Sequence, residues 1–389
     1  MKSLVIVAMK VLIGLFSRIF PRNDNTWVFG TSGGDVFWEN PKYFFLYMNH
    51  EKSGSDVRPI WISGSDEMVE NLKENGYEAY HRNSLKGLWF SLRAGRSFCS
   101  HNIEDINDYG LAVGSKIVHL HHGSPLKRIS WDVPMNNSNP FVIAGKIIYQ
   151  ALYYSYDIGI TTSDYLTNIY LSAEFLKPGR FEATGQPRND LFFRDVKDRE
   201  IGADEDAVKK MSSLDRTKVM YLPTWRDDDK YSFEDIIELE RMNKWARRND
   251  SVVIFKLHPA SNINEDAVKE FDNLWLMQQS VDLQPLLKET DILISDYSSV
   301  HNDFLLLDRP IVFYPFDKER YKKYRGFVRD YDYFTPGPKA YNFDELLECL
   351  DEVIEEDNYK DERKEIREKY FDDIDGNSSE RVWKMLRED

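Results

Sequence analysis

The chain has 389 residues, 42% of them hydrophobic and 30% charged, a composition typical of a folded globular protein with two ordinary domains. Its formal net charge of -15 argues against a general nucleic-acid-binding protein, because such proteins gain affinity by neutralising phosphates. The cysteines Cys99 and Cys349 are far apart and have no metal-ligand spacing, which indicates a reducing compartment without a disulfide framework.

The N-terminal segment 4–20 is mostly apolar but contains Lys10 and Arg18. The charges and the lack of a clear cleavage site argue against a secretory signal and a membrane-spanning helix. With about 100° per residue, the polar residues fall on one side, so we expect an amphipathic helix over 1–20. Two alternatives remain open. The helix lies on a membrane surface with its cations toward anionic headgroups, or it docks on the protein's own core.

From Pro21 onward, short β-rich runs alternate with helical stretches, a pattern that predicts βαβ units and a parallel sheet. The expected strands in the first series are 26–30, 58–63, 96–100, 116–122 and 157–163. The expected helices are 38–50, 65–76, 84–95, 140–156 and one that begins at Asp164.

A second series of the same kind begins near residue 180, after which the charged segment 195–210 is expected to be a solvated helix. Two consecutive series predict an α/β protein with two Rossmann-like domains that face each other across a cleft. Ligands of such sheets sit beyond the carboxyl ends of the strands. The expected strands are 218–224, 251–259, 291–297 and 310–316, and the helices 232–249, 283–289, 299–308 and 342–356.

The first chemical motif is 118-VHLHHGSPLKR-128, in which a β-rich run delivers three histidines and breaks at Gly123. Ser124 and the basic pair Lys127 and Arg128 follow at once. An imidazole beside a tight turn and cations is suited to general-base chemistry on an anionic substrate. The alternative is that the histidines are structural groups at a strand end.

Two further motifs place arginines just after turns or strands. In 185-GQPRND-190, Arg188 and Asn189 follow an enforced turn, and a loop arginine can bind a phosphate with two hydrogen bonds. In 221-YLPTWRDDD-229, Thr224 and Arg226 follow a strand that ends at a proline. The alternatives are a surface turn in the first motif and a core tryptophan with a surface arginine in the second.

The last two motifs follow buried strands of the second series. In 256-KLHP-259, alternation puts Lys256 and His258 on one face, where a cation and an imidazole suit an anionic group. In 295-SDYSSVHNDF-304, a helix start offers hydroxyls and N–H groups to a phosphate, although serines there are also ordinary helix caps. The residues concerned are Asp296, Ser298, Ser299 and, for a ribose diol, Asp303.

The motifs together suit a nucleotide-activated donor that contains phosphate, and their order resembles the CDP-glycerol glycerophosphotransferase family of teichoic-acid primases and polymerases. The resemblance covers roughly residues 26–360. The matching pieces are HHGSPLK, GQPRNDLF, YLPTWRDD, FKLHP and SDYSSVHNDFLLLDRPIVFYPFD, with an earlier similar piece at 39-ENPKYFF-45.

The resemblance implies a GT-B fold with an acceptor domain over 21–180 and a nucleotide-donor domain over 181–389. It implies transfer of a polyol phosphate, first of all glycerol phosphate, from a CDP-activated donor, with release of CMP. The acceptor would be a hydroxyl of a lipid-linked saccharide or polymer in teichoic-acid or similar cell-surface synthesis. The enzyme would be peripheral at the cytoplasmic membrane face and would need no cofactor and no metal.

The resemblance also implies roles for single residues. His122 matches the general base, and His258 would stabilise the transferred or leaving phosphate. His121, His301 and Asn302 depart from residues common in relatives. The donor phosphates would be bound by Arg226, Ser298, Ser299, Thr224 and Arg188 and the ribose by Asp303, supported by Gly123, Ser124, Asn189, Lys256 and Asp296.

Three alternatives keep the fold but change the function. A GT-B glycosyltransferase would use a nucleotide sugar and release a nucleoside diphosphate, whereas a ribitol-phosphate transferase would use CDP-ribitol. A membrane adaptor built on an inactive transferase fold would turn over no donor, and the pair of His122 and His258 argues against it.

Overall fold

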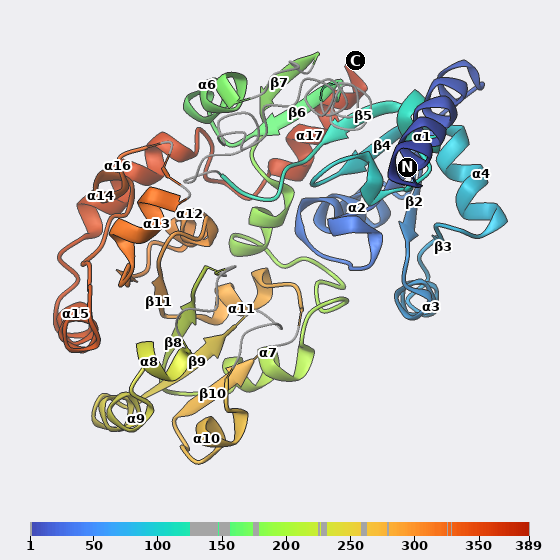
Figure 1. Ribbon diagram of the computed structural model, residues 1–389. Coiled ribbons are helices and arrows are strands. Elements are labelled where there is room, and N and C mark those ends of the chain that lie inside the picture. Colours follow the sequence, from blue (N-terminus) through green and yellow to red (C-terminus); the bar gives the residue numbers. More distant parts are fainter. Residues whose placement is uncertain are drawn as a thin grey trace. The chain divides into compact units, whose positions relative to one another are not determined.

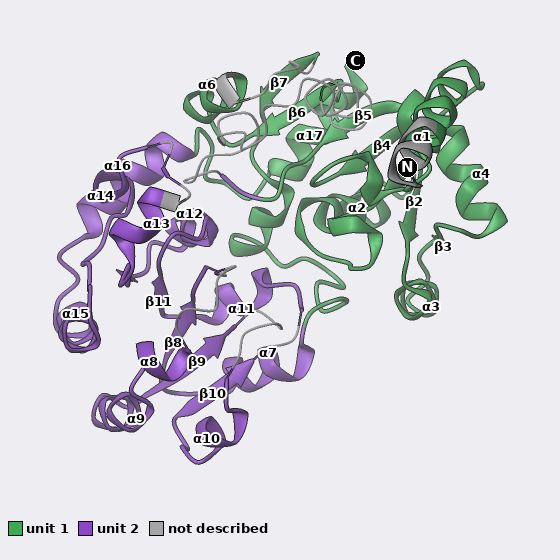
Figure 2. Ribbon diagram, in the orientation of Figure 1, with its two compact units in different colours: residues 1–122, 130–203, 371–389 green, residues 123–129, 204–370 purple. Residues whose placement is uncertain are grey.

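The structure is a computed structural model that describes residues 2–124, 147, 156–173, 179–224, 226, 232–257, 263–277, 280–324, 326–327 and 329–388. The chain divides into two compact units, shown in different colours in Figure 2. The first contains residues 1–122, 130–203 and 371–389, and the second contains 123–129 and 204–370. Each unit has its own parallel sheet, which confirms the predicted α/β class with two Rossmann-like domains.

The sheet of the first unit has seven parallel strands in the order β3-β2-β1-β4-β5-β6-β7. The order turns back between β1 and β4, which is the switch point at which open sheets of this type bind ligands. The strands are β1 (Asn23–Phe29), β2 (Arg58–Ser63), β3 (Ala79–His81), β4 (Ala94–Cys99), β5 (Lys116–His119), β6 (Ile158–Thr161) and β7 (Arg180–Ala183).

Side chains of β1 alternate between the two faces of the sheet, so that the core of this unit is divided between these faces. Trp27 and Phe29 are fully buried in one cluster, where the Phe29 ring stacks on Phe98 with centroids 4.5 Å apart. Val28 points to the other face and belongs to a second cluster with Ile60. The period of two residues per repeat explains why these adjacent apolar residues serve different faces.

The helices of the first unit are defined by ordinary start signals. Ser65 and Ser84 cap their helices by accepting the N–H groups of Met68 and Gly87. The helices are α1 (Lys2–Ile19), α2 (Glu39–Glu51), α3 (Asp66–Glu74), α4 (Leu85–Arg93), α6 (Asp164–Ala173) and α17 (Ser378–Arg387), with short 3-10 helices η1 (Ser32–Gly34), η2 (Ile103–Asp105), η3 (Leu111–Gly114) and η5 (Pro187–Phe192).

The second unit has five parallel strands in the order β10-β9-β8-β11-β12, with its own switch point between β8 and β11. The buried residues Val219, Phe255 and Ile294 share one core cluster with the adjoining helices. The strands are β8 (Thr217–Leu222), β9 (Ser251–Lys256), β10 (Leu274–Met277), β11 (Ile292–Ser295) and β12 (Ile311–Phe313).

Most helices of the second unit are short, and the longest are α15 (Phe343–Glu355) and α16 (Lys360–Tyr370). The helix that follows β11, α12 (Val300–Phe304), continues into a 3-10 turn, η6 (Leu305–Leu307). The others are α7 (Glu205–Ser212), α8 (Phe233–Ile236), α9 (Leu239–Arg248), α10 (Glu265–Lys269), α11 (Gln284–Glu289), α13 (Lys318–Tyr324) and α14 (Tyr331–Phe334).

The expected domain boundary at residue 180 differs from the division in the structure. Residues 181–203 and 371–389 belong to the first unit. Strand β7 pairs with β6, and the Asp190 carboxylate accepts the N–H groups of Ser378 and Ser379 at the start of α17. The contacts of Asp190 join segments far apart in sequence. The order of strands and helices along the chain does not predict such contacts.

Several local expectations also change. The helix expected over 195–210 forms only as α7, and the one expected over 232–249 is divided into α8 and α9. The helix expected over 140–156 lies outside the described residues, apart from the isolated positions 147 and 156. Within the part of the chain that the structure describes, no helix has the length and apolar character needed to cross a membrane.

Candidate active site

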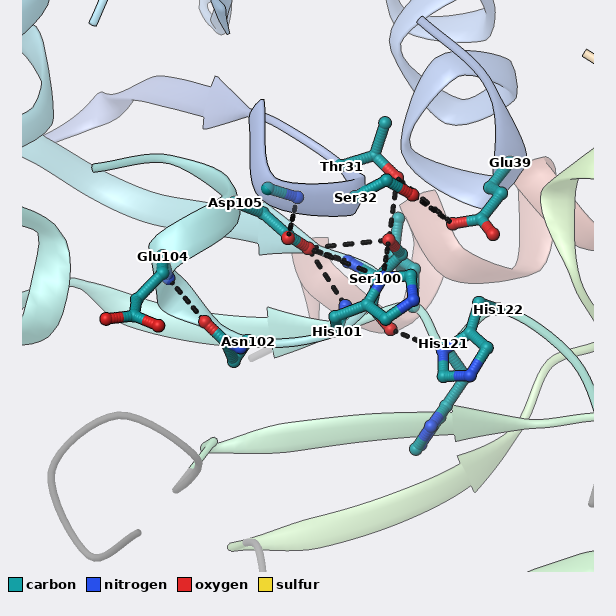
Figure 3. A network of polar contacts seen from close by, with 12 residues as sticks. Thr31, Ser32, Glu39, Ser100, His101, Asn102, Glu104, Asp105, His121 and His122 are labelled. Atoms are coloured by element: carbon teal, nitrogen blue, oxygen red, sulfur yellow. Dashed lines mark hydrogen bonds and ion pairs between the residues drawn. The ribbon is translucent and has the colours of Figure 1, made fainter. Parts of the chain in front are cut away.

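The polar residues of the first unit gather at the carboxyl ends of three neighbouring strands, next to the switch point of the sheet. Thr31 follows β1, Ser100 and His101 follow β4, and His122 follows β5 (Figure 3). Since β1 pairs with β4 and β4 with β5, parallel pairing places all three strand ends at one edge. This is where an open α/β sheet holds its ligand.

His122 has the hydrogen bonding of a general base. Its Nδ1 lies 3.1 Å from the carbonyl oxygen of Ser100. A carbonyl can only accept, so Nδ1 carries the proton and donates it to Ser100. The neutral ring therefore presents a lone pair on Nε2, the atom that would take a proton from a substrate.

The surroundings of His122 favour this neutral form. Desolvation lowers its pKa from 6.5, the imidazole of His101 and the guanidinium of Arg188 lower it further, and the carboxylate of Glu39 and the hydrogen bond to Ser100 raise it. The side chain is exposed, so solvent offsets part of the desolvation. A lowered pKa keeps the ring unprotonated at neutral pH, as a base must be.

A second imidazole lies flat against His122. The rings of His101 and His122 are stacked with centroids 4.1 Å apart and planes within 3°. The Nδ1 of His101 is 2.8 Å from the hydroxyl of Ser100. Ser100 therefore contacts both rings, one through its carbonyl and one through its side chain.

The stacked rings of His101 and His122 are held in place by a hydrogen-bond network of hydroxyls and carboxylates, shown in Figure 3. The Ser100 hydroxyl is 2.6 Å from that of Thr31, which donates to Glu39 over 3.0 Å. The buried Asp105 accepts the N–H groups of Ser100 and His101 at 3.0 and 2.9 Å. These bonds fix the turn after β4 and with it the two rings.

Backbone strain is concentrated around this network. Ser32, Glu39 and His121 have φ angles of 48°, 58° and 55°, in the left-handed region that residues other than glycine rarely adopt. Each such residue costs about 1–3 kcal/mol and persists where its surroundings demand it, often at functional sites. Here the strained residues flank Thr31 and His122.

Arg188 supports the turn that carries His122, and Asn189, the next residue in the sequence, is buried. The Arg188 side chain donates to the His122 carbonyl over 2.8 Å, and its backbone N–H donates to Asn40 over 3.1 Å. Asn189 is 3% exposed, and neither atom of its side-chain amide has a hydrogen-bond partner in the described part of the chain. The structure thus brings Arg188 to the predicted base, whereas no hydrogen bond joins the side chain of Asn189 to His122 in the described part of the chain.

The other two histidines of the first motif are structural. His119 donates from Nε2 to the carbonyl of His101 over 2.9 Å, and burial lowers its pKa to about 4. His121 is buried with its ring 4.2 Å from Tyr170 and 6.2 Å from Phe181. It therefore occupies an aromatic cluster.

In the second unit, Arg226 is held by two buried carboxylates. It contacts Asp296 at 2.5 Å and Asp317 at 2.8 Å, and it donates to the carbonyl of Thr224. Desolvation opposes its charge, but the two carboxylates raise the pKa of Arg226 above its ordinary value. The predicted phosphate ligand thus joins the loops after β8, β11 and β12.

The carboxylate of Asp296 also fixes the loop after β8 by accepting hydrogen bonds from backbone N–H groups. It accepts the N–H groups of Thr224 at 2.8 Å and Tyr297 at 2.5 Å. The hydroxyl oxygen of Thr224 is buried and has no hydrogen-bond partner among the described residues. Those residues contain no cluster of histidine, cysteine, aspartate or glutamate that could hold a metal ion.

The start of α12 places the remaining predicted donor residues. Ser298 and Ser299 are partly exposed, and Ser299 occupies the position before the helix. Asp303, one turn later, is buried and accepts the side-chain amide of Gln284 over 2.9 Å. His301 donates to the carbonyl of Ser298 over 2.7 Å, and burial lowers its pKa to about 4.

For the residues predicted to support the site, the structure shows local positions and contacts. Lys256 ends β9, and desolvation lowers its pKa. Gly123 has a φ angle of 149°, and the carbonyl of the buried Ser124 accepts the amide of Asn302 over 3.0 Å. His258, the second predicted catalytic residue, lies outside the described residues.

Comparison with known proteins adds a family model, described as CDP-Glycerol:Poly(glycerophosphate) glycerophosphotransferase, that matches residues 13–388. The chain belongs to the CDP-glycerol glycerophosphotransferase family. Its membership confirms the resemblance predicted from the motifs and the expectation that the protein is a transferase.

Two relatives and one solved structure show how far the similarity extends. The chain is 30% identical over 382 residues to a teichoic acid poly(glycerol phosphate) polymerase of Bacillus spizizenii, covering 92% of each chain. It is 27% identical over 383 residues to a teichoic acid glycerol-phosphate transferase of Staphylococcus aureus, covering 94% of this chain and 93% of that one. The wall teichoic acid polymerase TagF matches with a TM-score of 0.74 at 22% identity, over 98% of this chain and 93% of that structure, which supports the GT-B fold.

Sequence reasoning missed several residues of this glycerophosphotransferase site. Ser100 ends the predicted strand 96–100 and His101 follows it, yet neither belongs to a predicted motif. Glu39 begins the piece 39-ENPKYFF-45, which was noted only for its similarity to the family. A signal was available in the sequence. Ser100 and His101 lie at the end of one predicted strand and His121, His122 and Gly123 at the end of the next, so that the two strand ends could be expected to share one edge of a parallel sheet.

Proposed function

We propose that the protein transfers glycerol phosphate from CDP-glycerol to a hydroxyl of a lipid-linked saccharide or polymer and releases CMP, in the synthesis of teichoic acid or a similar cell-surface polymer. Membership of the family supports the donor and the reaction type. The observation that carries the proposal is the hydrogen bond from Nδ1 of His122 to Ser100, since it leaves Nε2 free to act as a base.

The reaction is an in-line displacement at the β-phosphorus of the donor. His122 takes the proton of the acceptor hydroxyl while its oxygen bonds to the β-phosphorus. The bond from that phosphorus to the bridging oxygen breaks, and the oxygen leaves with CMP. His258 would neutralise charge on the phosphates, as the family resemblance implies.

The donor would be bound by the second unit. The hydroxyl of Thr224, which has no partner among the described residues, and the partly exposed Ser298 and Ser299 would bind phosphate oxygens. Asp303, fixed by Gln284, would accept the ribose hydroxyls. Arg226 would act next to the phosphates while holding Asp296 and Asp317 in place.

A panel of donors tests the reaction. The purified protein is incubated with CDP-glycerol, CDP-ribitol and nucleotide sugars together with a lipid-linked acceptor, and the released nucleotide is identified. CMP from CDP-glycerol with phosphate transferred to the acceptor supports the proposal. Release of a nucleoside diphosphate from a nucleotide sugar would show a glycosyltransferase instead.

CDP-ribitol is the second candidate donor. A teichoic acid ribitol-phosphate polymerase of Staphylococcus aureus is 30% identical over 239 residues, which is 60% of this chain. The glycerol-phosphate polymerase of Bacillus spizizenii and the glycerol-phosphate transferase of Staphylococcus aureus match over more than nine-tenths of the chain, and glycerol is therefore the first choice. The same panel separates the two donors by their rates.

Membrane association would follow from the surface of the first unit. Part of the polar side of α1, which the sequence predicts to face headgroups, contacts the protein instead, because Lys10 pairs with Glu104 at 2.6 Å and Ser17 is buried, whereas Arg18 is exposed. Helix α1 lies beside α4 (Figure 1). The ring of Phe20, just after α1, contacts the ring of Trp89 on α4, and the apolar side of α1 is exposed. The exposed apolar side chains are Met9, Leu12, Leu15, Phe16, Ile19, Leu85 and Trp89.

This surface suits the cytoplasmic face of a membrane with anionic lipids. Ile19 and Leu85 are 80% and 88% exposed, and the exposed cations Arg18 and Lys86 lie in the same two helices. Apolar and basic side chains in one helical surface bind the boundary between headgroups and acyl chains. The two alternatives for segment 1–20 are thus compatible. One side of the helix docks on the protein, and the other would face the membrane.

Vesicle co-sedimentation tests the membrane proposal. The variant Leu12→Glu with Ile19→Glu should bind vesicles of anionic lipid at least about tenfold more weakly than the unmodified protein, because apolar area is lost and negative charge is added. Ile374→Glu, at an exposed apolar residue outside this surface, is the matched control. Equal binding by all three proteins would reject the membrane surface.

A further inference from the structure

Ser100 binds two imidazole rings at once, one with its carbonyl and one with its hydroxyl. The carbonyl accepts Nδ1 of His122 at 3.1 Å, and the hydroxyl lies 2.8 Å from Nδ1 of His101. The two rings are parallel within 3° (Figure 3). A single residue thus aligns the predicted base with a second histidine to which the reaction as described gives no role.

The hydroxyl chain behind Ser100 determines which nitrogen of His101 carries the proton. Glu39 can only accept, so Thr31 donates its hydroxyl proton to Glu39 over 3.0 Å. In the 2.6 Å contact between Thr31 and Ser100, the proton then comes from Ser100. The Ser100 hydroxyl is therefore an acceptor toward His101, and Nδ1 of His101 donates.

A second carboxylate acts in the same direction. The Ser100 hydroxyl also lies 3.4 Å from the buried Asp105, which can only accept. Either arrangement of the Ser100 proton points it away from His101. In its neutral form, His101 thus has the same tautomer as His122, with the lone pair on Nε2.

The two Nε2 atoms form a pair of hydrogen-bond acceptors. Both Nδ1 atoms face Ser100 and the rings are parallel, so both Nε2 atoms lie on the sides of the rings away from Ser100. The side chain of His101 is 39% exposed and His122 is also exposed. Neither Nε2 atom has a hydrogen-bond partner within the described part of the chain.

Two acceptors on rings 4.1 Å apart match two hydroxyls on adjacent carbons. A glycerol phosphate unit at the end of a polymer carries such a pair, because one of its three oxygens is esterified and two neighbouring hydroxyls remain. An acceptor that ends in a single hydroxyl would leave one of the two lone pairs without a donor, which lowers its affinity.

We propose that His101 is a specificity residue that accepts a hydrogen bond from the hydroxyl next to the attacking one, so that the enzyme selects acceptors ending in a 1,2-diol. His122 takes the proton of the attacking hydroxyl, and His101 neither gains nor loses a proton. The inference rests on the proposed function and adds the chemical class of the acceptor terminus.

The test compares two acceptors that differ by one hydroxyl. One ends in a glycerol phosphate unit and the other in the corresponding propanediol phosphate, which has the terminal hydroxyl but not its neighbour. The assay is run above the ordinary histidine pKa of about 6.5. The unmodified enzyme should show a kcat/KM about tenfold higher for the diol, the value of one neutral hydrogen bond.

The variant His101→Phe keeps a flat ring against His122 but has no nitrogen, and its ratio of the two kcat/KM values should fall close to one. Ser100→Ala removes the hydroxyl that holds His101 while the carbonyl that holds His122 remains, and its ratio should fall partway. It also serves as the second test where the first variant does not fold.

The outcomes separate this inference from the proposed function. A ratio that is the same in both variants as in the unmodified enzyme, or a ratio of one in the unmodified enzyme, overturns the role of His101. Absence of any glycerol phosphate transfer by the unmodified enzyme overturns the proposed function itself. Transfer with a ratio that falls in both variants supports both.

Discussion

At the scale of single residues, the chemistry of this protein depends on bonds that fix one form of an ionisable group. His122 is held by a carbonyl that can only accept, and Arg226 by two carboxylates that can only accept. The first arrangement leaves a lone pair available, and the second leaves a positive charge in place. Both follow from the donor and acceptor inventory of the side chains.

Replacement of His122 tests the assignment of the base. His122→Ala should reduce kcat by about 10²–10⁴, the contribution of general-base catalysis. The affinity for CDP-glycerol, measured by calorimetry, should change little, because the proposed donor residues Arg226, Ser298 and Asp303 lie in the second unit. A kcat close to that of the unmodified enzyme would show that another group takes the proton.

The carboxylate of Glu39 should set the pH at which the base is lost. His122 must be unprotonated to act, and its lowered pKa places the acidic limb of the pH profile of kcat/KM below 6.5. Glu39 raises this pKa, so Glu39→Gln should move the limb to a still lower pH. A shift toward higher pH would contradict this electrostatic role.

Arg226 should contribute strongly to stability as well. Arg226→Met would leave the buried Asp296 and Asp317 without their cation, and removing one partner of a buried pair costs about 3–5 kcal/mol. Chemical denaturation would measure the loss. Arg241→Met, which removes an arginine from exposed ion pairs, should lower the stability much less.

At the scale of elements, the strand ends and the last helix determine how the site is built. Parallel pairing brings the ends of β1, β4 and β5 to one edge, so that residues from three parts of the sequence form one network. The helix α17 closes the first unit from the other end of the chain. The hydroxyl of Tyr47, on α2, donates to Glu380 of α17 over 2.5 Å.

This contact predicts a pH dependence of stability. The hydrogen bond from Tyr47, together with Lys384 and Lys52, lowers the pKa of Glu380 from 4.5 to about 2. A depressed pKa stabilises the folded state above 4.5, and the contribution is lost as the pH falls through about 2. The difference in free energy of unfolding between the unmodified protein and Glu380→Gln should therefore shrink over that range. A constant difference would show that Glu380 is not ionised in this contact.

At the scale of the whole molecule, the chain forms two units, and its last segment returns to the first. The return depends on Asp190, whose two carboxylate oxygens accept the N–H groups of Ser378 and Ser379 at 2.8 and 2.9 Å. A contact between residues 188 positions apart thus completes the unit that carries His122.

Loss of this contact should affect one unit only. Asp190→Ala removes two hydrogen bonds at the start of α17 and should cost about 1–3 kcal/mol. Hydrogen exchange followed by mass spectrometry should show faster exchange in α17 and α2, with β8 to β12 unchanged. Faster exchange throughout both units would mean that the units unfold together.

The sequence by itself determined the alternation of strands and helices, the family and the identity of His122, Arg226 and Asp303 as candidates. These features depend on local periodicity and on motifs of consecutive residues. It did not locate the short strands β3, β7 and β10, whose three or four residues carry little pattern. It also did not assign 371–389 to the first unit.

Only the tertiary structure decided which groups face one another. The stack of His101 on His122, the contact of Ser100 with Thr31 and the two carboxylates on Arg226 join residues between 21 and 91 positions apart. Such contacts depend on the order and pairing of strands, which local pattern does not specify. For this reason the sequence predicted a candidate base, His122, whereas the fold determined the tautomer of this side chain, the direction of its pKa shift and its neighbour.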